Sequence, residues 1–339
     1  MASTDPTRFS AHERETRLII YDNPQYDEHD PGWGHPECPA RLPSIRQALA
    51  PHHWPVRQGR KASFEDLSRV HTEAHIDHVM AAAGQTTRLD PDTGVSPGSV
   101  DAALLAAGSS VEAAEVTLAG RNCFVTCRPP GHHATPDRAM GFCLFNNAAV
   151  AAAHMVHLGY RVAVLDPDAH HGNGTQDVFY RSSEVLYVSW HRSPFFPGTG
   201  QAEELGAGTG AGFTLNIPLP MGADDGLYLT ALQRLVLPAL QAFQPDAVIF
   251  SAGFDQMEGD LLGGMDLSRE GLAVIYNAIA ARWRCMAVLE GGYNLRRLGG
   301  DVEVAARMMA GHPAPDVAVR VHDDWRAMFD NWQHPLREI

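Results

Sequence analysis

The sequence predicts an α/β fold in which one mostly parallel sheet carries helices on both faces. Short apolar, β-branched runs recur along the chain, and Ala-rich or amphipathic segments of helical length separate them. This alternation is typical of parallel α/β sheets. The chain has 339 residues, of which 45% are hydrophobic, so it can bury a sizeable core. Its length allows one large domain or two smaller ones.

The expected elements follow one another from the N-terminus. Residues 1–16 are expected to be flexible, and residues 22–41, rich in Pro, Gly, His and Asp, are expected to form a long loop. Strands are expected at 18–21, 123–127, 162–165, 185–189, 247–251 and 286–289. Helices are expected at 100–118, 148–158, 228–243 and 269–283, with a short one after residue 300. Gly120 and Gly159 are expected to end the first two helices.

Composition and charge disfavour several classes of protein. The formal net charge of −14 disfavours nucleic acid as a partner. The five cysteines are scattered and form no Cys-x-x-Cys pair, which disfavours a disulfide framework and a cysteine-based zinc site. Residues 1–17 contain no apolar signal-peptide core, and no apolar run reaches the roughly 18 residues of a membrane helix. We expect a cytoplasmic protein with no membrane partner, and the sequence is compatible with an oligomer.

Four polar clusters stand directly after expected strands. They comprise residues 128–133, 166–176, 251–255 and 290–293. In an open α/β sheet, ligands bind outside the carboxyl ends of the strands, so the four clusters are expected to meet at one rim. The run 166–176 is the densest, with two Asp and two His close together, and it ends in polar backbone that is expected to be flexible.

The residue types in these clusters indicate metal-dependent hydrolysis. Three protein ligands and a water form a catalytic zinc site, and Asp168, His170 and Asp255 supply three ligands. Such a metal lowers the pKa of the water and polarises a substrate carbonyl. Alternation along an extended chain places Asp168 and His170 on one side and His171 on the other. His171 is therefore expected to be structural.

Further side chains in the clusters suit proton transfer. His132 and His133 are candidates to take a proton from the water and deliver it to the leaving amine. Tyr293 is expected to donate a hydrogen bond to the developing oxyanion. Asp166 and Asn173 are expected to orient the two imidazoles. The other histidines of the chain are expected to be surface residues or hydrogen-bonded core residues.

Together these motifs resemble the zinc-dependent histone deacetylase superfamily, which includes bacterial histone-deacetylase-like amidohydrolases, acetylpolyamine amidohydrolases and acetoin-utilisation proteins. The matching stretches are HPECPARL (35–42), VSPGS (95–99), RPPGHHA (128–134), GFCLFNNAAVAA (141–152), VAVLDPDAHHGNGTQDVFY (162–180), FFPGTG (195–200), SAGFD (251–255) and EGGYN (290–294). The resemblance implies a single arginase-like α/β domain over residues 17–339. It also implies a central, mostly parallel sheet of eight strands.

The resemblance assigns chemical roles to individual residues. The zinc ligands of the family match Asp168, His170 and Asp255. His133 matches the general base and acid, His132 the imidazole that stabilises the transition state, and Tyr293 the tyrosine that polarises the carbonyl. Asp166 matches the carboxylate behind His132. Asn173 stands behind His133, where some members have Asp, and resembles the class II side of the family.

The resemblance also implies binding residues. Gly141, Phe142 and Phe196 match a tunnel that grips an acyl-lysine stem, and Arg41 matches an arginine near the acetate exit channel. Main-chain oxygens around Asp166, Asp168 and His170, with Ser189 and Trp190, match a structural potassium site.

Four positions depart from the family pattern or align with variable positions. Pro167 stands where an aromatic or aliphatic residue is usual, and Trp190 replaces the commoner Leu; neither has a functional explanation. Leu262 matches a gatekeeper that is Glu in a polyamine-selective branch, so it offers no charge to a second ammonium. Asp92 aligns with a residue at the rim that holds the backbone amide of the substrate.

The sequence thus predicts a zinc-dependent amidohydrolase that removes an acetyl group from a primary amine. The substrate is expected to be an acetyl-lysine side chain or a related acylated amine. One alternative is an acetylpolyamine or another small N-acetyl metabolite, and a second is a non-catalytic protein that binds acyl-lysine. A third is an arginase-like enzyme with two manganese ions, which needs more Asp-rich motifs than this chain has. The sequence leaves open whether zinc or iron(II) fills the site.

Overall fold

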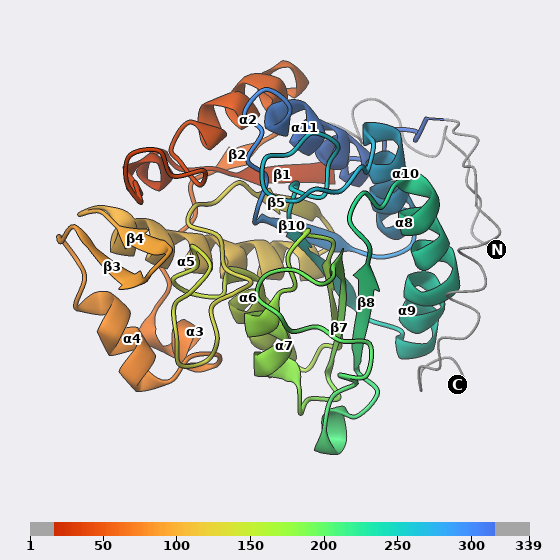
Figure 1. Cartoon of the computed structure of the whole chain (residues 1–339), viewed down its shortest axis with the longest axis horizontal. Coiled ribbons are helices and arrows are strands. Elements are labelled where there is room, and N and C mark those ends of the chain that lie inside the picture. The colour runs from red at the N-terminus through yellow and green to blue at the C-terminus, as the bar shows by residue number, and fades with distance from the viewer. Residues whose placement is uncertain (1–16, 316–339) are drawn as a thin grey trace.

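A computed structural model describes residues 17–315 and contains an eight-stranded sheet in which every strand runs parallel to its neighbours (Figure 1). The strand order is β2-β1-β5-β10-β9-β6-β7-β8. The strands are β1 (Leu18–Tyr21), β2 (Val56–Arg57), β5 (Asn122–Val125), β6 (Val162–Asp166), β7 (Val185–Arg192), β8 (Thr214–Leu219), β9 (Ala247–Ala252) and β10 (Cys285–Leu289). The predicted fold class and strand number are confirmed.

All six strands predicted from apolar runs are present, and two further strands of the sheet were not predicted. The central strands are buried along their whole length, which is why their sequences are continuously apolar. β2 has only two residues, both exposed, so it has no hydrophobic pattern. β8 contains Pro218, which normally argues against a strand; here β8 is an edge strand, where a proline is tolerated.

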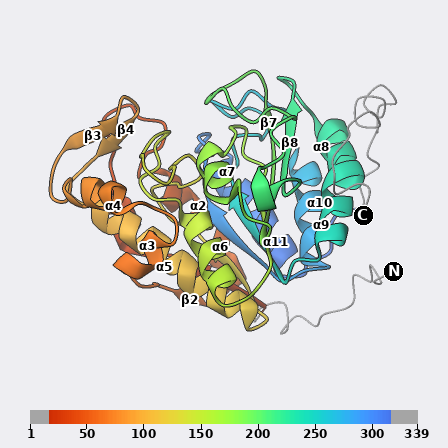
Figure 2. The same cartoon turned by 90° about the horizontal axis from the view of Figure 1, so that it is seen from below.

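Helices cover both faces of the sheet, as predicted (Figures 1 and 2). One face is covered by α5 (Ser99–Leu118) and α6 (Asn147–His157), which pack against each other. The opposite face is covered by α2 (Arg41–Leu49), α10 (Arg269–Ala280) and α11 (Leu298–Met309). No helix within residues 17–315 is both long and apolar enough to cross a membrane.

The predicted helix 228–243 is interrupted. The structure has α8 (Asp225–Ala231), a π-helical turn (Leu232–Val236) and α9 (Leu237–Phe243). Pro238 explains the interruption, because proline has no N–H to donate to the preceding turn. A wider π-helical turn is one way for a helix to accommodate such a lost bond.

Several short elements lie in segments for which no regular structure was predicted. They are a 3-10 turn (Pro24–Glu28), α3 (Phe64–Ser68), α4 (Glu73–Met80) and a hairpin of β3 (Thr87–Asp90) and β4 (Thr93–Val95). The prediction of flexible backbone at the end of the run 166–176 was wrong, because α7 (Asn173–Phe179) begins there. Tertiary contacts hold its first turn: the Thr175 N–H donates to the His132 carbonyl oxygen at 3.2 Å. The predicted flexible residues 1–16 lie outside the described residues.

The sheet order brings the predicted polar clusters together. The strands that precede the four clusters are β5, β10, β9 and β6, and they are neighbours in the middle of the sheet. Because they are parallel, their carboxyl ends meet at one rim. The residues that follow them are therefore side by side in space, although they are spread over about half of the chain.

Candidate active site

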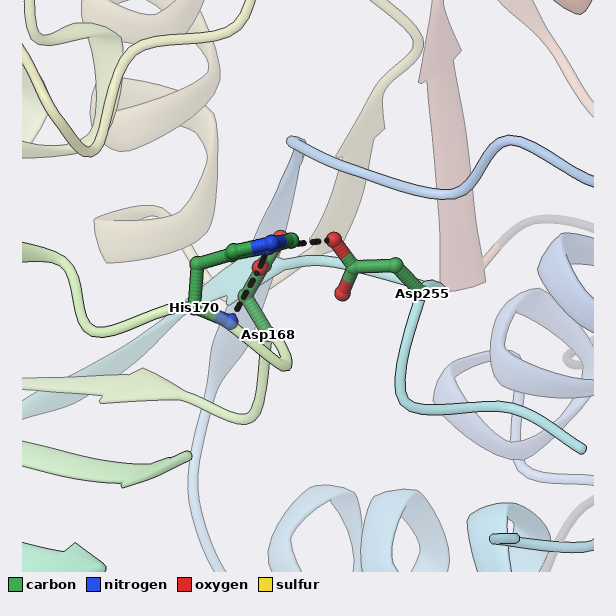
Figure 3. A group of neighbouring side chains, drawn as sticks. All are labelled: Asp168, His170 and Asp255. Carbon is green, nitrogen blue, oxygen red and sulfur yellow. Dashed lines mark hydrogen bonds and ion pairs between the residues drawn. The ribbon is translucent and has the colours of Figure 1, made fainter. Parts of the chain in front are cut away.

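Asp168, His170 and Asp255 lie together beyond the ends of β6 and β9 (Figure 3). One potential ligand atom from each residue lies within 4.8 Å of those of the other two. His170 Nδ1 is 3.1 Å from Asp168 Oδ1 and 2.9 Å from Asp255 Oδ2. Both carboxylates are fully buried, and the His170 side chain is 12% exposed. The structure thus brings together the three residues that the sequence predicts as ligands.

Main-chain groups fix the two carboxylates. The Gly291 N–H donates to Asp168 Oδ2 at 3.0 Å, and the Ala169 N–H donates to Asp255 Oδ1 at 2.7 Å. A Cβ atom at Gly291 would lie 2.4 Å from Asp255 Oδ2, and one at Gly253 would lie 2.1 Å from Asp168 Oδ2. Only glycine allows the backbone to approach the carboxylates this closely.

The electrostatics of this group suit a cation. Burial alone would lower the pKa of His170, but the carboxylates of Asp255 and Asp168 raise it to about 10. Burial and the neighbouring Asp168 raise the pKa of Asp255 to about 7. Two carboxylates and one imidazole nitrogen are a suitable donor set for zinc. The residues present therefore fit a zinc ion with Asp168, His170 and Asp255 as its protein ligands.

His132 and His133 follow β5 and stand beside this group. Their ring centroids are 4.0 Å apart, and the His133 centroid is 6.1 Å from that of His170. His132 Nδ1 is 3.1 Å from Asp166 Oδ2, and His133 Nδ1 donates to Asn173 Oδ1 at 2.9 Å. Each ring thus uses Nδ1 for an orienting contact. In each ring, Nε2 is then available to take part in the reaction.

The two imidazoles differ in charge because their partners differ. Burial would lower the pKa of His132, but the carboxylates of Asp166 and Asp168 raise it well above its usual value. The pKa of His133 is held well below its usual value by burial and by the neighbouring His132 and His170. A charged and a neutral imidazole stand side by side, so one can stabilise negative charge while the other accepts a proton.

Tyr293 follows β10, and its side chain lies beside that of Arg41, the first residue of α2. The Tyr293 side chain is buried, and burial raises the pKa of its hydroxyl well above the usual value, so the hydroxyl keeps its proton. The Arg41 guanidinium lies 5.3 Å from the centroid of the Tyr293 ring. It donates to the carbonyl oxygens of Glu290 at 2.6 Å and Gly292 at 2.8 Å. Arg41 therefore fixes the backbone that carries Tyr293.

Two buried carboxylates support the site and were not assigned a role from the sequence. Glu37 pairs with Arg41 at 3.0 Å and binds Arg128 through both of its oxygens. Glu290 accepts from the N–H groups of Gly131 at 2.6 Å and His132 at 3.1 Å. Both carboxylates belong to matching stretches of the sequence, in HPECPARL and EGGYN. Their unusual burial could not be seen there.

Three of the predicted substrate-contacting residues, Gly141, Phe142 and Phe196, lie next to candidate catalytic side chains. The Phe196 ring is 5.1 Å from His133, and the Phe142 ring is 6.0 Å from Tyr293, both as centroid distances. A Cβ atom at Gly141 would lie 2.4 Å from His133 Cδ2, which explains the glycine. The Gly141 N–H donates to Asp92 Oδ1 at 3.1 Å. A tunnel between the two phenylalanines remains a prediction, as does a contact from Asp92 or from the half-buried Leu262 to the substrate.

The residues predicted for potassium lie at the end of β6, in the loop that follows it and in β7, and they share Asp168 and His170 with the metal group. Asp166 and Ser189 are paired in the register of β6 and β7, and Trp190 is buried in β7. Ser189 Oγ is 2.8 Å from His191 Nδ1. Potassium at this place remains a prediction. His171 is buried and hydrogen-bonded to Thr199 and Gln176, and it is not part of the Asp–His–Asp group.

Comparison with known proteins relates most of the chain to one family. The profile described as "Histone deacetylase domain" matches residues 35–309. A "Probable deacetylase" of Archaeoglobus fulgidus is 37% identical over 295 residues, which cover 83% of this chain and 82% of that protein. The "Histone deacetylase-like amidohydrolase" of Pseudomonas aeruginosa is 43% identical over 253 residues, which cover 70% of this chain and 66% of that protein. The crystal structure of the HDA15 HD domain matches with a TM-score of 0.85 and 35% identity, covering 94% of this chain and 96% of that one.

Proposed function

The chain belongs to the histone deacetylase family, and we propose that it hydrolyses the amide bond of acetylated primary amines with one zinc ion. Membership of this family makes it a hydrolase that acts on amide bonds. One observation carries the proposal: three candidate metal ligands, two tandem imidazoles and a protonated tyrosine meet at one rim of the sheet. We also propose that residues 17–339 form a single catalytic domain, of which residues 17–315 are described.

Asp168, His170 and Asp255 would hold the zinc ion, which supplies a water of lowered pKa and polarises the acyl carbonyl. Three is also the number of protein ligands that a catalytic zinc site has. The backbone N–H groups of Ala169 and Gly291 keep the two carboxylates in place. The backbone thus holds both carboxylates in place independently of a bound metal.

The two imidazoles have different roles, since one transfers protons and the other stabilises charge. His133 is neutral and carries its proton on Nδ1, so its Nε2 can take a proton from the attacking water and later give it to the leaving amine. His132 is held in its charged form beside Asp166 and stabilises negative charge in the transition state. Asn173 and Asp166 are positioning residues, because each fixes one ring through Nδ1.

Tyr293 would donate a hydrogen bond to the developing oxyanion. Its hydroxyl keeps a proton that it can donate, and Arg41 holds the backbone on both sides of Gly291. A preorganised donor of this kind is effective because it needs no reorientation as charge develops. Phe142 and Phe196 lie beside Tyr293 and His133, where they would contact the stem of the acylated amine.

For the substrate we propose an acetyl-lysine side chain. By the family resemblance, Leu262 matches a gatekeeper that is Glu in a polyamine-selective branch, and leucine offers no charge to a second ammonium. The alternative is an acetylpolyamine or another small N-acetyl metabolite. The "Probable deacetylase" and "Histone deacetylase-like amidohydrolase" relatives are compatible with both.

The proposal is tested by a substrate panel. The full chain is purified, its metal content is measured by elemental analysis, and hydrolysis is followed on acetyl-lysine peptides, acetylpolyamines and a fluorogenic trifluoroacetyl-lysine. We expect hydrolysis that a chelator abolishes and that zinc, or iron(II), restores. Asp255→Asn should lose both metal and activity, whereas Asp77→Asn, on the exposed face of α4, should keep both. If no substrate is hydrolysed by metal-loaded protein, the enzymatic proposal is wrong.

A further inference from the structure

Two large apolar side chains are exposed on neighbouring loops close to the candidate active site. Met221 is 69% exposed and Leu261 is 71% exposed. The loops that carry them are joined by a hydrogen bond from the Gly222 N–H to the Gly264 carbonyl oxygen at 2.9 Å. We call these two side chains the apolar shelf. Each of them offers apolar area that a bound molecule can remove from water.

A continuous series of contacts connects the shelf with the metal group. The Phe195 ring stacks on His170 at a centroid distance of 4.9 Å. The Arg192 guanidinium lies 4.0 Å from the Phe195 centroid, and its Nη2 is 3.3 Å from Met221 Sδ. Met221 is therefore connected to a candidate ligand through Arg192 and Phe195.

Leu261 is connected to the catalytic tyrosine. Asp260, its neighbour in the chain, accepts hydrogen bonds from the N–H groups of Tyr293 at 2.6 Å and Leu262 at 2.8 Å. Arg192 also donates to the Gly263 carbonyl oxygen at 3.2 Å. The loop that carries Leu261 is thus fastened both to Tyr293 and to Arg192. The position of Leu261 relative to the reacting atoms is fixed by these contacts.

We infer that the apolar shelf binds an apolar side chain next to the acylated lysine, so that the substrate is a polypeptide with an apolar residue beside that lysine. This inference rests on the proposed deacetylase function. A substrate whose acyl group reaches the metal group must extend its remaining part over the surrounding loops, where Met221 and Leu261 are exposed. Burying an apolar side chain of the substrate against them is favourable in proportion to the apolar area removed from water.

The same surface is unsuited to a polyamine. Arg192 contacts three neutral groups on this wall, namely the Phe195 ring, Met221 Sδ and the Gly263 carbonyl oxygen. The two loops also carry the carboxylates of Asp260 and Asp266. The discrimination therefore rests on the absence of an apolar side chain from a polyamine. The shelf thus favours the polypeptide over the small metabolite.

The inference is tested with matched peptides. Acetyl-lysine peptides carrying Leu or Ser beside the lysine, on either side, are compared with a capped acetyl-lysine that has no flanking residues. On the zinc-loaded full chain we expect kcat/KM for one Leu peptide to exceed that of its Ser counterpart roughly tenfold, as burial of one such side chain allows. Leu261→Ser and Met221→Ser should each reduce this preference severalfold, and the double variant should abolish it. For the capped acetyl-lysine, kcat/KM should fall much less in these variants than it falls for the Leu peptide.

The control is Leu158→Ser, which removes an exposed leucine (49%) at the far end of α6 and should leave the preference unchanged. Fluorescein-labelled versions of the peptides give dissociation constants by anisotropy, so the preference is measured even if hydrolysis fails. Equal values for Leu and Ser peptides with the wild type, or a preference that survives in the double variant, would overturn the inference. Light scattering gives a second outcome that would overturn it: the serine substitutions dissociate an oligomer of the wild type, while the preference for the Leu peptide stays intact. The shelf would then be an interface between copies of this chain. If the wild-type chain hydrolysed none of the substrates, the capped acetyl-lysine included, that result would instead count against the proposed function.

Discussion

His133 Nδ1 donates a hydrogen bond to the side-chain oxygen of Asn173 at 2.9 Å, and this contact fixes both the orientation and the tautomer of the ring. The amide group of Asn173 is itself held, since its Nδ2 faces the His133 carbonyl oxygen at 3.5 Å. Because Asn173 begins α7, the ring is oriented by a helix rather than by a loop. The neutral imidazole thus carries its proton on Nδ1, and its Nε2 is available to accept another.

Removal of the Asn173 side chain should therefore impair catalysis more than binding. We expect Asn173→Ala to lower kcat roughly 10- to 100-fold with little change in KM, because the ring loses its orientation. Asn173→Asp keeps an acceptor oxygen and should retain much more activity. Steady-state kinetics of the two variants check this. An equal fall of kcat in both variants would show that the hydrogen-bond acceptor at this position is not required.

Replacing Tyr293 by Phe should remove the oxyanion donor alone. We expect kcat to fall on the order of 10²–10³-fold, with unchanged zinc content and an unchanged thermal unfolding midpoint. The ring keeps its place beside the Arg41 guanidinium, because phenylalanine fills the same space. An unaltered kcat would exclude Tyr293 from the mechanism.

Glu290 offers a test of how the backbone of the tandem histidines is held. Its Oε2 accepts from the N–H groups of Gly131 and His132, and its Oε1 accepts from Ser251 Oγ at 2.8 Å. Glu290→Ala leaves the two buried N–H groups without an acceptor, which should cost about 2–5 kcal/mol of unfolding free energy and lower kcat as well.

A glutamine at this position can satisfy all three partners, since its oxygen can accept from both N–H groups while its amide donates to Ser251 Oγ. Glu290→Gln should therefore retain the fold and most of the activity. Chemical denaturation and kinetics measured on the same samples distinguish the two variants. If the alanine variant were as stable and active as the glutamine variant, the carboxylate would have no positioning role.

His71 should make the protein sensitive to mild acid. Its Nδ1 donates to the Thr135 carbonyl oxygen at 3.0 Å and its Nε2 accepts from the Asn146 N–H at 2.9 Å, so the folded state has no place for a second proton. Burial and the neighbouring His75 lower its pKa to about 3. Below about pH 6.5 the unfolded chain binds a proton that the folded chain does not, so stability falls as the pH is lowered from there towards 3.

The contribution of His71 between pH 7 and pH 5 should be about 2 kcal/mol. Denaturation curves at the two pH values give the fall in unfolding free energy for the wild type and for His71→Gln. We expect a fall that is smaller by about this amount in the variant. An identical fall in both proteins would show that other groups are responsible.

The contrast between β6 and β8 shows which parts of the fold could be predicted from the sequence. The buried strand β6 is apolar throughout, so its pattern reveals it, and the polar run that follows it marks the rim of the sheet. β8 is hidden by Pro218, which is tolerated only because the strand lies at an edge, and its place at the edge is a property of the whole sheet. Similarly, α7 begins with weak helix formers whose bonds go to the loop of His132.

Within the site, the candidate ligands and imidazoles could be predicted because a few residue types in known motifs carry them. The supporting carboxylates could not. Glu37 and Arg128 are 91 positions apart, and Glu290 is 158 positions from His132. A carboxylate in a sequence is far more often exposed than buried, and only tertiary structure shows that these two are enclosed with their partners.

The position of β10 in the sheet has a consequence for folding during synthesis of the chain on the ribosome. β10 lies between β5 and β9, yet only α11 follows it among the elements described. Until Cys285–Leu289 are synthesised, β5 and β9 lack the strand that pairs with both of them, so each would present an unpaired edge if it folded. At that stage the chain contains the candidate ligands Asp168 and Asp255 but not yet Gly291 and Tyr293. Among the described elements β10 is the last strand to be synthesised, so the candidate site lacks Gly291 and Tyr293 until synthesis has passed this strand.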